Sequence, residues 1–115
     1  MLFRSVVRRC DSGQRGYTGI AKREALYYLG MVAMNMNQFD QALKFFYQCD
    51  EMCRVLDKEE PSPFMTMTNL RIGMVYDVQK KRNYAIMQYQ KVQRLRSFEN
   101  SRELADQYVK KPYVQ

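Results

Sequence analysis

Two glycines, Gly30 and Gly73, each begin the same pattern of spaced residues. An alanine follows each glycine by twelve residues, and an aromatic residue follows that alanine by four. The two copies are offset by 43 residues, and in both copies apolar residues recur at steps of three and four, which place them on one face of an α-helix. We therefore expect two similar pairs of antiparallel helices that pack closely where the small residues cross. The packing positions are Leu29, Gly30, Ala42 and Phe46 in the first copy and Ile72, Gly73, Tyr76, Ala85 and Tyr89 in the second.

Signals for helix ends divide the first copy into two helices. Thr18 is a candidate N-cap, and Asn37 suits the left-handed turn that ends a helix. The next helix is expected from Phe39 to about Leu56, because Pro61 disfavours helix in the residue before it. No segment shows the alternation of a strand, and only 5 glycines and 3 prolines interrupt the chain.

The second copy has equally clear signals, and a fifth helix follows it. Ser62 and Pro63 form a helix start, since Ser is a preferred N-cap and Pro fits the first helical position. Residues 79–81 are a polar turn. Asn100 and Glu103 have the spacing of a capping box, which predicts a last helix that ends before Pro112.

The spacing of glycine, alanine and aromatic residues resembles the tetratricopeptide repeat. Four features differ from that family. The offset is 43 residues rather than about 34, and neither copy ends in the usual proline. Ala33 stands where a bulky aromatic residue usually follows the glycine by three, and Arg82 stands where an aromatic residue usually precedes the alanine by three. The resemblance implies an all-α fold, an α-α superhelix (solenoid) of two hairpins at about 20–58 and 62–97, closed by a capping helix within 98–115. Two unrelated hairpins in a helical bundle remain the alternative.

The family binds extended peptides or partner helices in a concave groove lined by the first helix of each hairpin. The resemblance therefore implies a protein-interaction module, a scaffold or adaptor whose partner is another protein or further repeats of the same chain. Several groove residues are methionines, whose flexible side chains adapt to different apolar partners, although they could instead pack against a neighbouring helix. The implied groove residues are Tyr27, Met31, Met34, Met67, Leu70, Met74 and Asp77.

The sequence offers no catalytic or metal-binding constellation. It contains no His, no Gly-rich phosphate loop and no nucleophile paired with a base. Cys49 and Cys53 lie one helical turn apart and are expected to pack as small apolar residues. The chain is therefore expected not to be an enzyme and to need no cofactor. A catalytic domain in a longer protein is the alternative, with this chain as its C-terminal docking or stability segment, in an enzyme or a lipoprotein.

The net charge of +7 raises a second alternative, a basic helical repeat associated with nucleic acid. We do not favour this alternative, because basic residues in a turn and on an outer helix face are ordinary solvated surface. As a separate point, no apolar run reaches the roughly 18 residues of a membrane span. The odd cysteine count of 3 favours a reducing, cytoplasmic location. The basic residues concerned are Lys80, Lys81, Arg82, Lys91, Arg94 and Arg96.

Residues 1–16 are basic and lack a helical period, so they are set apart from the repeats of residues 17–97. They are interpreted in three ways: as a disordered tail, as a mitochondrial-type presequence, or as a translation artefact. The third interpretation arises because residues 2–5 back-translate onto the end of a common sequencing adapter. In that case the protein would continue upstream.

Overall fold

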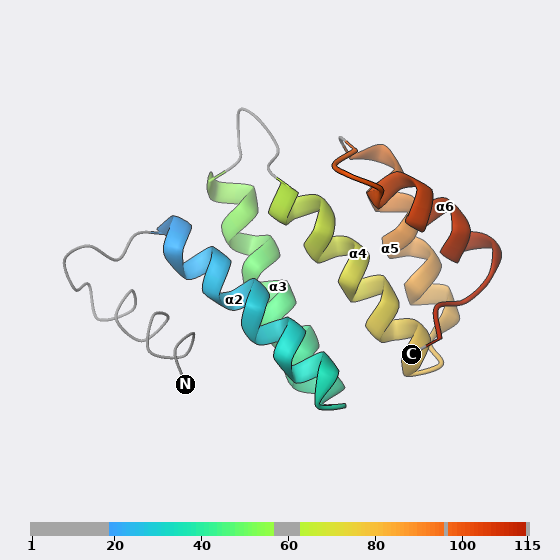
Figure 1. The fold of residues 1–115 in the computed structure, drawn as a ribbon, viewed down its shortest axis with the longest axis horizontal. Coiled ribbons are helices and arrows are strands. Elements are labelled where there is room, and N and C mark those ends of the chain that lie inside the picture. The colour runs from blue at the N-terminus through green and yellow to red at the C-terminus, as the bar shows by residue number, and fades with distance from the viewer. Residues whose placement is uncertain (1–18, 57–62, 96, 115) are drawn as a thin grey trace.

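The computed structural model describes residues 19–56, 63–95 and 97–114, and in this part of the chain it shows five helices and no strand (Figure 1). The helices are α2 (Gly19–Asn35), α3 (Phe39–Leu56), α4 (Pro63–Val78), α5 (Arg82–Arg94) and α6 (Ser101–Lys110). The predicted all-α class is confirmed, and the predicted starts at Phe39 and Pro63 match those of α3 and α4. The proposed caps Thr18 and Ser62 lie outside the described residues.

Each described helix packs against the next one along the chain, so that α2 pairs with α3 and α4 pairs with α5. The helix α4 also contacts α2 on one side and α6 on the other. The helices α2, α4 and α6 therefore lie next to one another, while α3 and α5 pack behind them (Figure 1). None of the described helices combines the length and the apolar character that are needed to cross a membrane.

Both hairpins are closed by the same turn. Asn37 and Lys80 occupy equivalent places and adopt left-handed φ angles of 59° and 63°. In the first hairpin the amide of Gln38 donates to the carbonyl of Ala33 at 2.8 Å, and the equivalent bond in the second hairpin has the same length. This is the Schellman motif, in which the left-handed residue lets the chain satisfy the last helical carbonyls.

The two glycines lie where the helices of each hairpin cross. A Cβ atom at Gly30 would stand 2.5 Å from the ring of Phe46, and one at Gly73 would stand 2.5 Å from the ring of Tyr89. Both rings are completely buried, so neither has room to move aside. The remaining packing positions are buried as well, except Tyr76, which is half-buried.

The expected capping box of the last helix is wrong. Asn100 precedes α6 but makes no side-chain cap, because its ψ of 23° is far from the extended backbone of an N-cap. The buried hydroxyl of Ser101 instead accepts the amide of Phe98 at 3.1 Å. Glu103 lies in the first turn, where its charge still suits the helix dipole. The helix ends at Lys110, ahead of Pro112, as predicted.

The glycine contacts predict an unusual response to alanine. Gly30→Ala should lower the free energy of unfolding by up to about 2 kcal/mol, because an overpacking cost of about 1–3 kcal/mol is only partly offset by a helix-propensity gain of about 1 kcal/mol. Urea unfolding followed by circular dichroism measures the change. In a Phe46→Leu background the ring is absent, so Gly30→Ala should leave the free energy of unfolding unchanged or raise it. An equal decrease in the free energy of unfolding in both backgrounds would contradict the contact between Gly30 and the ring of Phe46.

Candidate partner-binding pocket

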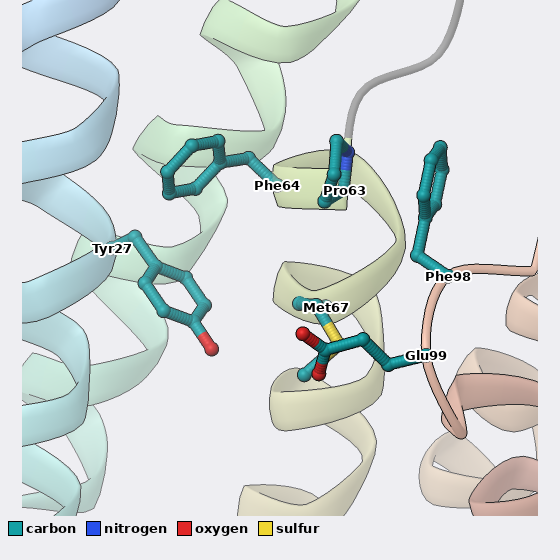
Figure 2. Close-up of a pocket in the computed structure, with 6 residues that line it drawn as sticks. All are labelled: Tyr27, Pro63, Phe64, Met67, Phe98 and Glu99. Atoms are coloured by element: carbon teal, nitrogen blue, oxygen red, sulfur yellow. The ribbon is translucent and has the colours of Figure 1, made fainter.

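An apolar pocket of about 290 Å³ lies between α2, the first turns of α4 and the segment that precedes α6 (Figure 2). It is formed on the side where α2, α4 and α6 lie next to one another. In Figure 2 the side chains of Tyr27 and Phe64 stand on one side of the first turns of α4, and Phe98 stands on the other. The lining residues are Tyr27, Pro63, Phe64, Met67, Phe98 and Glu99.

The wall made by Tyr27 and Phe64 is held by aromatic packing. The two rings meet edge to face with centroids 5.6 Å apart, and Tyr27 also contacts the buried ring of Phe46 at 6.0 Å. The guanidinium of Arg23, itself a buried residue, lies 5.1 Å from the centroid of Phe64, within the range of a cation–π contact. This wall is therefore pre-formed rather than assembled by a ligand.

The opposite wall is formed by Phe98 and Glu99, which stand in the segment between α5 and α6. Glu99 has a left-handed φ of 53°, and the bond from the amide of Phe98 to Ser101 fixes the chain directly before α6. The guanidinium of Arg102 adds a bond of 3.2 Å to the carbonyl of Leu95. The carboxylate of Glu99 extends towards Met67 rather than away from the pocket (Figure 2).

The structure brings only part of the predicted groove to the surface. Tyr27 and Met67 line the pocket, and Met31 is half-buried against the core. The expectation of an open groove is wrong for the remaining apolar residues, which belong to the core because neighbouring helices cover them. These residues are Met34, Leu70 and Met74, with exposed fractions of 3%, 1% and 5%.

Four pocket residues were not predicted in the groove, and one of them, Pro63, was expected only as a helix start. Phe64 precedes the periodic stripe of its helix, and Phe98 and Glu99 lie in a loop. The available signal was Phe98 itself, a large aromatic residue outside any helical period, which an isolated loop has no reason to carry.

Asp77 was also expected in the groove, but it is a buried structural acid. Its two carboxylate oxygens accept bonds of 3.0 Å from one nitrogen of Arg82, and one of them also accepts the hydroxyl of Tyr89 at 2.6 Å. The amide of Tyr113 completes the set at 3.0 Å. The side chain of Asp77 is only 1% exposed, so its charge is neutralised within the protein.

Arg82, the residue that departs from the family pattern, connects this acid to α6. Its second terminal nitrogen donates to the carbonyls of Tyr108 and Val109 at 2.7 and 2.8 Å. These carbonyls belong to the last turn of α6 and have no partner inside that helix. A planar guanidinium can serve a carboxylate and two carbonyls at once, which a lysine cannot do.

The other buried acid, Asp50, joins three helices. It accepts the amide nitrogen of Asn69 from α4 at 2.9 Å and the Nε atom of Arg54 at 3.0 Å, and the ammonium of Lys91 from α5 lies 3.9 Å away. Burial lowers the pKa of Lys91, while the charge of Asp50 opposes that shift.

The basic residues of the second hairpin have different surroundings. Arg82 and Lys91 are engaged in ion pairs with buried acids, whereas Lys80, Lys81 and Arg94 are exposed. Arg96 lies outside the described residues.

The cysteines of α3 are part of the core. Cys49 and Cys53 are completely buried and not bridged to each other. The thiol of Cys49 lies 3.4 Å from the carbonyl of Arg23 and 3.3 Å from the hydroxyl of Thr68, so it ties α3 to both α2 and α4. Within the described residues no group of three or more acidic, cysteine or histidine side chains could hold a metal ion. Cys10 lies outside the described residues.

Comparisons with protein-family models, with curated proteins and with solved structures gave no match to this chain. The fold and the pocket define an all-α protein of two similar helical hairpins and a closing helix. Its function is therefore argued from the geometry of these residues.

The Asp77 cluster predicts alkaline instability. Burial, and then the bond to Asp77, raise the pKa of Tyr89 above its ordinary value of 10.0. The folded state thus keeps a proton that the unfolded state loses, so stability is present below about pH 10 and falls as pH rises, by about 1.4 kcal/mol per pH unit for one such group. Urea unfolding between pH 8 and about pH 11 should show this slope reduced in Tyr89→Phe. Identical pH slopes in Tyr89→Phe and in the unmodified protein would contradict the raised pKa of Tyr89 in the folded state.

Proposed function

We propose that this chain is a protein-interaction module and not an enzyme, built as a short tetratricopeptide-like solenoid with α6 as its closing helix. The proposal is supported by the equivalence of the two hairpins, which share their turn geometry and their glycine–aromatic contact at a constant offset of 43 residues. It is supported as well by the arrangement in which α4 contacts both α2 and α6. That arrangement gives one side of the molecule to the first helix of each hairpin.

The observation that carries the proposed function is the pocket on this side. Its volume of about 290 Å³ is near the lower end, about 300 Å³, of small-molecule sites, which suits one or two side chains of a partner better than a cofactor. Its walls are aromatic and apolar, and an anchor side chain that enters it would gain about 25 cal/mol per Å² of buried apolar surface. We therefore propose that a peptide or helix of another protein inserts an anchor here.

A docking or stability segment of a larger protein is the second candidate. The first hairpin favours it, because Tyr28, Val55 and Leu56 are exposed by 39%, 69% and 39%. Apolar side chains of this size at one end of a helical stack would be covered by a further hairpin. In that case the pocket would still face a partner, while the compartment, predicted as cytoplasmic, would be decided by the larger protein.

The pocket predicts which residues a bound peptide affects. Peptides selected from a random displayed library on the folded protein should shift the methyl resonance of Met67 in a sample with carbon-13-labelled methionine methyl groups. Met67→Gln should weaken their binding about tenfold, because it removes apolar contact surface worth roughly 1–2 kcal/mol. Titration followed by nuclear magnetic resonance measures both effects.

Met87 is the matched control for this experiment. It is 63% exposed on α5 and does not line the pocket, so Met87→Gln should leave the affinity unchanged. Selected peptides that bind equally well to Met67→Gln, or that shift other methionines and not Met67, would contradict the proposed site.

A further inference from the structure

Apart from the hydroxyl of Tyr27, the side chains that line the pocket are apolar except at one place, the carboxylate of Glu99 (Figure 2). This side chain is exposed and is directed towards Met67, in front of the first turns of α4 (Figure 2). Among the described residues, no lysine or arginine forms an ion pair with it. A ligand in the pocket therefore meets one negative charge whose counter-ion the described part of the protein does not provide.

A cationic side chain lies against the opposite wall of the pocket. The guanidinium of Arg23 lies against the ring of Phe64, on the Tyr27 side. A cationic group in the pocket is thus attracted to the carboxylate of Glu99.

We propose that the occupant of this pocket is an arginine side chain of a partner peptide, with its aliphatic stem over Met67 and its guanidinium against Glu99. This inference rests on the proposed function and specifies its ligand. Arginine combines an apolar stem with a charged head, which matches a largely apolar pocket with one carboxylate in its lining. Its planar head can pair with the carboxylate through two hydrogen bonds at once.

Two other kinds of anchor fit less well. A wholly apolar side chain would cover the carboxylate of Glu99 without a counter-ion, and removing an unpaired charge from water is costly. An acidic side chain would approach a like charge, which disfavours binding in the same place. The protein carries a net charge of +7, so its preference for a basic peptide has to arise from this local carboxylate.

The test uses N-acetyl-arginine amide and its neutral analogue N-acetyl-citrulline amide, each titrated into the full chain while the methyl resonance of Met67 is followed. The arginine compound should shift this resonance saturably and bind about tenfold more tightly than citrulline, which keeps the shape and loses the charge. Glu99→Gln should abolish this difference. Glu103→Gln is the matched control, since it removes an exposed charge of α6 that does not line the pocket, and it should leave the difference intact.

Equal affinity for the two compounds, no shift with either, or a preference that survives Glu99→Gln would overturn the inference. Its failure differs from that of the proposed function. Library peptides that shift the Met67 resonance and bind equally well to the unmodified protein and to Glu99→Gln would support the interaction site and exclude arginine as its occupant. Library peptides that never affect the Met67 resonance would contradict the proposed site itself.

Discussion

The contact between a helical glycine and a buried aromatic ring determines most of this structure. At Gly30 and at Gly73 the missing Cβ leaves space for the ring of the facing helix, so the two helix axes approach closely. The first ring, Phe46, packs on Tyr27, which in turn supports Phe64 in the wall of the pocket. The corresponding ring of the second hairpin contacts Tyr108 of α6, with centroids 5.5 Å apart. The segment that precedes α6 forms the other wall, and the hydrogen bonds of Phe98 and Arg102 hold it in place.

Equivalent positions of the two hairpins carry different chemistry because they have different neighbours. Met34 of the first hairpin corresponds to Asp77 of the second, and Phe39 corresponds to Arg82. In the first hairpin these positions are apolar and pack within the core or against it. The second hairpin instead faces the end of α6, whose last carbonyls require donors, and Arg82 supplies them while Asp77 neutralises its charge. A buried polar pair is stable here because its charges are mutually paired and its hydrogen bonds extend to fixed partners.

Much of the fold could be predicted from the sequence, because helical periodicity, the glycine–alanine–aromatic spacing and the turn signals are local properties. The left-handed conformation of Asn37 could be predicted, because Asn tolerates a positive φ. The same conformation at Lys80 could not be predicted from its residue type. The pocket was only partly predictable. Which side chains of a first helix stay open depends on how far one hairpin is rotated against the next, and that rotation buries Met34 and Met74 while it leaves Met67 accessible. Phe98 and Glu99 reach the pocket through a loop, which periodicity does not describe.

The most direct test of this account is to observe the two glycine contacts in solution. A nuclear Overhauser experiment on protein with selectively labelled Gly, Phe and Tyr measures proximity between the α-protons of each glycine and the ring protons of the facing residue. The account predicts a cross-peak between Gly30 and Phe46 and an equivalent one between Gly73 and Tyr89, because each ring lies directly against the place of the missing Cβ. Absence of either cross-peak from the folded protein would contradict the claim that both hairpins are packed through the same contact between a glycine and an aromatic ring.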